Sequence, residues 1–161
     1  MTAGLVTGLV GAAAVGCGLM AGLLFAFSAV SMPSLRQRRP AEGIGGMQTI
    51  NVVIVNPLFL LVFLGTAAAS LALLVTVLRS SDRTAHLDLI GAGALYLVGT
   101  MVVTAAANVP RNDELDALDP TDPASADAWR RYLRGWTAWN HVRTTSCVAA
   151  LALLLVALAR G

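Results

Sequence analysis

The sequence predicts an all-α protein: a four-transmembrane-helix bundle with an amphipathic interfacial helix before the last span. Of its 161 residues, 57% are hydrophobic and only 12% are charged, whereas a soluble domain carries about a quarter charged residues. The hydrophobic residues collect in four runs, at residues 5–31, 52–78, 87–109 and 137–159. A long polar loop, residues 110–136, separates the last two runs. These observations predict one integral membrane domain over residues 1–161, with no separate soluble domain.

The first run, residues 5–31, is long enough to cross about 30 Å of hydrocarbon at about 1.5 Å per residue. Ala29-Val30-Ser31 imitates the cleavage site of a signal peptide. However, the apolar stretch is too long for a signal peptide, and no basic residue precedes it. We therefore expect this run to be retained as a span.

Small residues recur every four positions along the first run. One row contains Gly4, Gly8, Ala12 and Gly16, and a second row contains Gly18 and Gly22. Small residues at this spacing let helix backbones approach closely in lipid. We favour close packing inside the bundle, and the alternative is a homo-oligomer surface on this Gly-rich helix.

The second run begins beside Asn51, Asn56 and Pro57, after an expected loop over residues 36–49. Proline lacks an amide hydrogen, so Pro57 either starts the helix or kinks it. Asparagine side chains or water would satisfy carbonyl groups that a kink releases. The third run, residues 87–109, ends in the polar sequence Asn108-Val109-Pro110-Arg111-Asn112.

The polar stretch before the last run divides into two parts. Residues 111–122 are acidic and rich in turn-forming residues, and Asp122-Pro123 is typical of a helix start. After it, aromatic and apolar residues repeat at helical spacing, at Trp129, Tyr132, Leu133, Trp136 and Trp139. Since the arginines here fall on another face, we expect an amphipathic interfacial helix that bends into the fourth span.

Four spans place both termini on one side of the membrane with the short loop 79–86. The other side carries most of the arginines: Arg36, Arg38, Arg39, Arg111, Arg130, Arg131, Arg134 and Arg143. The side of the termini carries Arg79, Arg83 and Arg160. The positive-inside rule therefore predicts cytoplasmic long loops, and we expect the protein in a bacterial inner (plasma) membrane.

The sequence lacks the residue patterns that several classes of function require. Cys17 and Cys147 lie in apolar runs without metal-type spacing, so we expect buried thiols. A disulfide between them would need the first and last helices side by side at that depth. The sequence has no Cys/His cluster, no Gly-rich phosphate loop and no Ser-His-Asp set. We expect no metal and no other cofactor, and the net charge of +2 indicates no nucleic-acid partner.

Polar side chains at the ends of all four runs converge on the long-loop side. Trp136, Asn140 and Arg143 share one helical face because they are spaced i, i+4 and i+7. His141 points elsewhere and is a weaker candidate. Polar groups at a membrane boundary are costly to bury and usually face a partner or a cavity. We therefore expect a pocket that admits a flat lipophilic molecule from the membrane.

The side chains available in this pocket are a guanidinium, carboxamides and indoles. In a water-poor site they can stabilise a developing enolate or phenolate by hydrogen bonds and positive charge. An opposing interpretation is purely structural. Tryptophans anchor helices at membrane boundaries, asparagines cap helix ends and arginines extend to lipid phosphates.

Two motifs in these segments resemble those of the anthrone oxygenase-like family of small four-helix membrane proteins. They are Asn108-x-Pro110-x-Asn112-x-x-Leu115, and Trp129-x-x-Tyr132 followed by Trp136-x-x-Trp139-Asn140-x-x-Arg143. Asn51 and Asn56-Pro57-Leu58-Phe59 are similar to the family's second-helix motif, and residues 25–33 to the end of its first helix. The resemblance implies the four-helix fold. It also implies that some relatives oxidise polyketide anthrones to anthraquinones with molecular oxygen, without metal or flavin.

Our leading hypothesis is therefore a cofactor-independent oxygenase whose substrate is a small anthrone-like or hydroquinone-like lipophilic aromatic. The candidate catalytic residues are Arg143, Asn140, Asn108, Asn112 and, as the fallback base, His141. The candidate substrate-binding residues are Trp136, Trp139, Asn51, Asn56, Trp129, Tyr132 and Phe25. Membrane lipids are its other expected partners. The alternative is a non-enzymatic membrane protein that binds a lipophile or stabilises a partner subunit.

Overall fold

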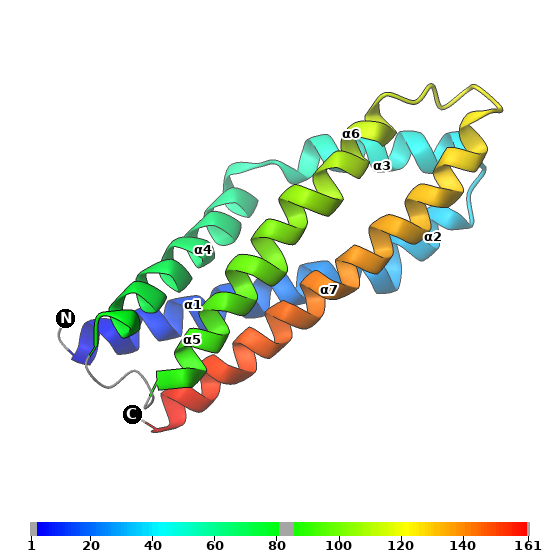
Figure 1. The fold of residues 1–161 in the computed structure, drawn as a ribbon. Helices are drawn as coiled ribbons and strands as arrows, with labels where there is room; N and C mark the ends of the chain where they lie inside the picture. The colour runs from blue at the N-terminus through cyan, green and yellow to red at the C-terminus, as the bar shows by residue number, and fades with distance from the viewer. Residues whose placement is uncertain (1–2, 81–85, 161) are drawn as a thin grey trace.

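Four long helical stretches lie side by side in the computed structural model, which describes residues 3–80 and 86–160 (Figure 1). The described residues contain helices and no β-strand. The four stretches long and apolar enough to cross a membrane are Gly4–Arg36, Pro57–Leu78, Leu87–Asp116 and Ser125–Arg160. The predicted all-α bundle with four membrane-spanning helices is confirmed, and these helices mark the chain as an integral membrane protein.

The first and third stretches are each built from consecutive helical segments. The first contains α1 (Ala3–Ala26), the π-helix η1 (Phe27–Ser31) and α2 (Met32–Arg36). The third contains α5 (Leu87–Ala94), the π-helices η3 (Leu95–Val102) and η4 (Thr104–Asn108), and α6 (Val109–Asp116). The remaining helices are α3 (Pro40–Ile54), α4 (Pro57–Leu78) and α7 (Ser125–Arg160).

The start of α1 and the end of α7 lie at the same end of the bundle, which we call the terminal end (Figure 1). The opposite end, which we call the loop end, contains α2, α3, α6 and the start of α7. This agrees with an even number of spans. Arg83, in the short loop of the terminal end, lies outside the described residues.

Two helices extend further toward the loop end than their apolar runs predicted. They continue to Arg36 and Asp116 rather than ending at residues 31 and 109. In both cases a π-helix ends two residues before a proline, since η1 precedes Pro33 and η4 precedes Pro110. A proline ring clashes with the carbonyl group four residues earlier and lacks an amide hydrogen. The wider π turn accommodates this defect, so the helix continues.

Residues 36–49 were expected to form a loop, but most of this segment belongs to α3. Pro40 occupies the first turn of α3, where a missing amide hydrogen costs little. The helix buries Gly43, Ile44 and Met47. The predicted second span began at residue 52, but residues 52–54 belong to α3. The spanning helix α4 begins only at Pro57.

The predicted polar loop 110–136 is mostly helical, because α6 and α7 leave only residues 117–124 between them. The helix α7 begins at Ser125, and the Asp122 carboxylate accepts a hydrogen bond from the Ala124 amide at 2.8 Å before it. It then runs unbroken for 36 residues where we expected a bend. The amphipathic segment is thus the first part of α7, with Arg130, Arg131 and Arg134 exposed.

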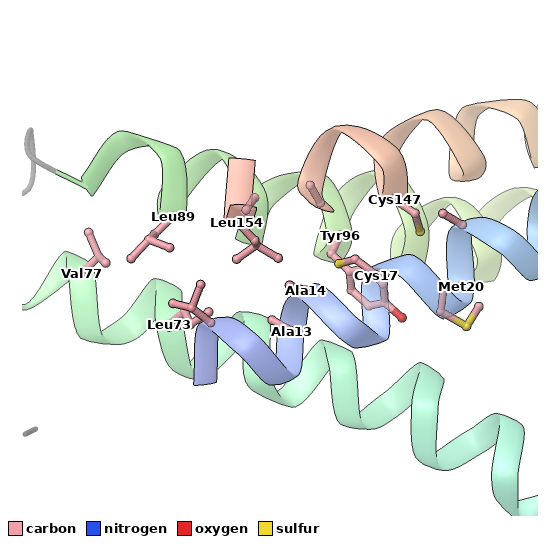
Figure 2. Close-up of a cluster of buried hydrophobic side chains, with 14 of the residues drawn as sticks. Ala13, Ala14, Cys17, Met20, Leu73, Val77, Leu89, Tyr96, Cys147 and Leu154 are labelled. Atoms are coloured by element: carbon pink, nitrogen blue, oxygen red, sulfur yellow. The ribbon is translucent and has the colours of Figure 1, made fainter. Parts of the chain in front are cut away.

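An apolar core fills the space between α1, α4, the α5–η3 segment and α7 (Figure 2). Cys17 and Cys147 are both free and fully buried in it, and the Cys147 sulfur lies 3.1 Å from the Thr100 hydroxyl. Close backbone approach depends on small residues. A Cβ atom on Gly16 would lie 1.9 Å from Thr66 Oγ1 of α4, whereas Gly4, Gly8 and Gly22 have open space beside them.

A second hydrophobic core occupies the loop end and is made by side chains of α2, α3, α6 and α7. Its buried members are Met32, Ile44, Met47, Leu115, Trp129, Tyr132, Leu133 and Trp136. The apolar face of the first part of α7 therefore packs against protein. Polar side chains that carry the predicted site lie between this second core and the apolar core.

Candidate functional site

A group of buried and half-buried polar side chains surrounds Trp136, and we call it the polar cluster. Its members are Thr104, Asn108, Asn112, Asn140 and Arg143. They come from η4, α6 and α7. The helical spacing of Trp136, Asn140 and Arg143 places all three toward the bundle interior, where each is buried.

Asn140 connects α7 to the first helical stretch. Its amide nitrogen donates to the Leu24 carbonyl and to the Ser28 hydroxyl, both at 2.7 Å. Its side-chain oxygen accepts from Arg143 Nη2, also at 2.7 Å. Both ends of this carboxamide are thus occupied by protein groups. Asn140 fixes the depth of α7 against α1 and η1.

Arg143 is a buried cation, with only 7% of its surface exposed. Its Nη1 donates to the Thr104 hydroxyl at 3.2 Å, and its guanidinium carbon lies 5.2 Å from the centroid of the Trp136 ring. Arg143 forms no ion pair with any carboxylate in the described part of the chain. Its Nε has no hydrogen-bond partner there either. A buried charge stabilised only by neutral acceptors and an indole face is costly to keep without a function.

Asn108 supplies a second unsatisfied atom. It is 1% exposed, and its amide nitrogen donates to the Trp136 carbonyl over a long 3.3 Å. The Asn108 Oδ1 atom has no partner among the described residues. Buried polar atoms are nearly always hydrogen-bonded in native proteins. Asn108 Oδ1 and Arg143 Nε are thus an unpaired acceptor and an unpaired donor near one indole, and an additional polar group could satisfy both.

Asn112 orients two aromatic side chains. Its side-chain oxygen accepts from Trp136 Nε1 at 2.9 Å and from the Tyr132 hydroxyl at 3.0 Å. Tyr132 in turn stacks on Trp129, with ring centroids 5.5 Å apart and planes at 15°. The three aromatic rings therefore have fixed positions relative to the polar cluster.

The π-helices supply several contacts of this site. η1 carries Ser28 and also Phe27, whose ring centroid lies 5.7 Å from that of Trp136. η4 carries Thr104 and Asn108. A π-helical turn is energetically unfavourable compared with an α-helical one and is frequent at functional sites.

Ser28 and Thr104 were not predicted from the sequence, and neither was Gln48. The Gln48 amide donates to the carbonyls of Leu115 and Leu118 at 3.0 and 3.1 Å, which satisfies the end of α6. Serine and threonine are common in membrane helices and give no distinctive signal. Gln48 could have been found as an uncharged polar residue on a face that otherwise buries Ile44 and Met47.

Five predicted residues belong neither to the polar cluster nor to the three aromatic rings beside it. Phe25, Trp139 and His141 are exposed. Asn56 caps α4 by accepting from the Phe59 amide at 3.0 Å. Asn51 donates to Asp116 at 3.5 Å and also interacts with the Tyr132 side chain, at the margin of the second core. The candidates that the structure brings together are Arg143, Asn140, Asn108, Asn112, Trp136, Tyr132 and Trp129.

A groove of about 750 Å³ lies between the η1–α2 segment and the first part of α7. His141 and Trp129 line it, whereas Arg143 does not. Ser28 connects the two regions, because it lines the groove and also accepts the hydrogen bond from Asn140. We expected a pocket beside Arg143, but Arg143 does not line this groove, and it bonds instead to Asn140 and Thr104 of the polar cluster.

Within residues 3–80 and 86–160, no group of three or more His, Cys, Asp or Glu side chains is placed to hold a metal ion.

The fold and the polar cluster define a class of protein: a small four-helix integral membrane protein with a buried, uncompensated arginine near one membrane boundary. The chain matches the anthrone oxygenase family over residues 59–153, more than half its length. It therefore belongs to the anthrone oxygenase family. The matched region includes every member of the polar cluster. Among curated proteins and solved structures, no match was found.

Proposed function

We propose that this protein is an oxygenase that oxidises a lipophilic anthrone-like or hydroquinone-like aromatic with O2 and without a cofactor. Membership of the anthrone oxygenase family supports an oxygenase-like role. The observation that carries the proposal is the pair of unpaired buried atoms beside Trp136, Arg143 Nε and Asn108 Oδ1. A substrate with both an ionisable oxygen and a hydroxyl group would satisfy both atoms.

In this proposal Arg143 stabilises the enolate oxygen of the substrate. A charged donor in a water-poor site stabilises a developing oxyanion more than water does. Asn108 accepts a hydrogen bond from a substrate hydroxyl, and the Trp136 ring contacts the aromatic face. The contacts that a substrate would replace are the two longest, Arg143 to Thr104 at 3.2 Å and Asn108 to the Trp136 carbonyl at 3.3 Å.

The proposed reaction needs no oxidant other than O2. Loss of the acidic benzylic proton gives an enolate, and O2 adds at that carbon to form a peroxide. Loss of water from the peroxide leaves a second carbonyl group. The sum is anthrone plus O2 giving anthraquinone plus water. The proton passes first to water or to His141, which faces the neighbouring groove, and it returns when the peroxide loses hydroxide.

Oxygen uptake by the purified protein in nanodiscs, with an anthrone as substrate, tests this proposal. Removing a preorganised oxyanion donor lowers turnover by about 100-fold or more, so Arg143→Ala should lose most of the activity. Arg131→Ala is the matched control, since Arg131 is an exposed arginine on the same helix, and it should retain the wild-type rate. Quinone absorbance should rise in step with oxygen consumption.

Asn108→Leu provides a second variant, because it removes the unpaired acceptor and preserves Arg143. It should raise KM for hydroxylated anthrones more than for an anthrone without a hydroxyl group. The proposal fails if wild-type protein consumes oxygen no faster than empty nanodiscs. It also fails if Arg143→Ala is folded and fully active.

A second candidate is a non-enzymatic role in binding a lipophile or stabilising a partner subunit. The observation in its favour is that Asn112 and Asn140 are satisfied within the chain. Under this interpretation Arg143→Ala lowers thermal stability, and no anthrone increases oxygen uptake above that of empty nanodiscs.

A further inference from the structure

The groove between the η1–α2 segment and α7 has a charge distribution that the proposed oxidation does not use. Four arginines line it: Arg36, Arg38, Arg130 and Arg134. No aspartate or glutamate lines it. We call it the basic groove.

Three of these arginines form no salt bridge within the described chain. Arg130 pairs with Asp127 on the neighbouring turn of α7. Arg36, Arg38 and Arg134 form no ion pair with a described residue. All three line one concave surface, and Arg38 interacts electrostatically with a nearby carboxylate, that of Glu42. Such a surface attracts an anion, and arginine binds phosphate through two parallel hydrogen bonds.

The floor of the basic groove is apolar. Met32, Trp129 and Leu133 line it and are buried, whereas Pro33 and Ala138 line it and keep apolar surface exposed. An inorganic anion alone would leave this apolar floor in contact with water. An amphiphile would cover the floor with hydrocarbon and place its charge at the arginines, which removes apolar surface from water.

The surface becomes apolar from the groove toward the membrane-spanning part of α7. Arg134, His141 and Val148 recur at seven-residue intervals and therefore share one face of the helix. Val148 is 52% exposed, and on the adjacent first helical stretch Phe25 is 62% exposed. A hydrocarbon chain leaving the groove in this direction would continue onto a lipid-facing surface.

We propose that the basic groove is a binding site for an anionic phospholipid of the surrounding bilayer. The phosphate group binds between Arg36, Arg38 and Arg134. The upper part of an acyl chain lies over Met32 and Leu133 and continues toward Val148. A volume of about 750 Å³ accommodates the headgroup and the start of the chain, while the rest of the lipid stays in the bilayer.

The arginines of this site take no part in the proposed oxidation, because no member of the polar cluster lines the basic groove and the oxidation shares only His141 with it. A variant of Arg134 therefore separates the two proposals. It should change lipid binding and leave anthrone-dependent oxygen uptake at the wild-type rate.

Native mass spectrometry of the full chain in a neutral detergent tests lipid binding. The probes are phosphatidylglycerol and phosphatidylcholine with identical acyl chains. The wild-type protein should bind phosphatidylglycerol more tightly. Each arginine near an anionic lipid surface contributes about fivefold in affinity, so Arg134→Gln should weaken phosphatidylglycerol binding about fivefold and leave phosphatidylcholine binding unchanged.

Arg131→Gln is the matched control, since Arg131 is exposed on the same helix but does not line the groove. It removes the same charge and should leave both affinities unchanged. Equal loss in the two variants would overturn the site, because the attraction would then be general. Equal affinity for the two lipids would overturn it as well. A third arm adds inorganic phosphate; displacement of phosphatidylglycerol at equal concentration would show an anion site without lipid recognition and contradict the proposal.

Discussion

Asn140 and Arg143 show how a charge is kept inside this bundle without a carboxylate. The Asn140 oxygen accepts from the guanidinium, and its nitrogen is occupied by Leu24 and Ser28. The Trp136 ring covers the guanidinium at 5.2 Å. A neutral acceptor and an aromatic face offset only part of the cost of burying a cation. The charge therefore remains available to an anionic group, which a full ion pair would prevent.

Asn140→Leu should destabilise the protein by about 1–3 kcal/mol, because it leaves Arg143 Nη2 without its acceptor and removes the hydrogen bonds that join α7 to Leu24 and Ser28. Thermal unfolding in detergent, followed by tryptophan fluorescence, measures the loss. Thr145→Val is the control. Thr145 is exposed on the same helix and bonds only to the His141 carbonyl of its own helix, so its transition should shift little. A stable Asn140→Leu variant would show that this network contributes little to folding.

The helices of this bundle approach one another closely at a few glycines. A Cβ atom on Gly99 of η3 would lie 2.1 Å from Oγ and 2.6 Å from Cβ of Ser146 on α7. No rotation of Ser146 moves its own Cβ away, so the two helices would have to separate. Because lipid chains are as apolar as leucine, close packing of this kind drives helix association in membranes. Gly99 therefore positions η3, and the following η4, against α7.

Gly99→Ala should cost about 1–3 kcal/mol through overpacking. Gly65→Ala is the matched control within α4, since nothing lies within 4 Å of the added atom. Alanine has the higher helix propensity, so this control should be neutral or gain up to about 1 kcal/mol. Unfolding temperatures of the two variants in the same detergent provide the comparison. Equal temperatures would refute a tight contact between η3 and α7.

Two hydrophobic cores follow one another along the length of the molecule, and polar side chains collect around the second one. The apolar core fills the terminal end, and the second core with α3 and the start of α7 fills the loop end. The polar cluster lies where the two cores meet. The basic groove lies beside it, between the η1–α2 segment and the first part of α7. A substrate and a lipid could therefore both reach the loop end from the same leaflet.

The loop end is predicted to face the cytoplasm, because it carries most of the arginines. Cysteine labelling can test this, since Cys17 and Cys147 are buried and should give little background. A cysteine introduced by Thr121→Cys should react with a membrane-impermeant maleimide in inverted vesicles only. One introduced by Arg79→Cys should react in right-side-out vesicles only. The reverse pattern would place the loop end outside.

Several features of the site follow from local spacing and could be predicted. Trp136, Asn140 and Arg143 share a helical face in any α-helix, and all three are buried. The same reasoning places His141 on another face, where it is exposed. Asn56 was predicted as a substrate-binding residue, and its place directly before Pro57 also matches its observed role as a helix cap. The sequence shows Pro33 and Pro110 near the ends of two hydrophobic runs, where a helix would be expected to stop. It does not show the π-helical turns before them, which let both helices continue.

The sequence by itself determined the membrane class, the four spans and the polar face of the last helix, because these depend on composition and on the helical repeat. Only the tertiary structure decided which groups pair with that face. Asn140 bonds to Leu24, 116 residues earlier, and no local pattern encodes such a contact. The tertiary structure also decided where the groove lies: His141 and four arginines line it, and Arg143 does not. Which side of α7 stays open depends on how α2 and α3 pack over it.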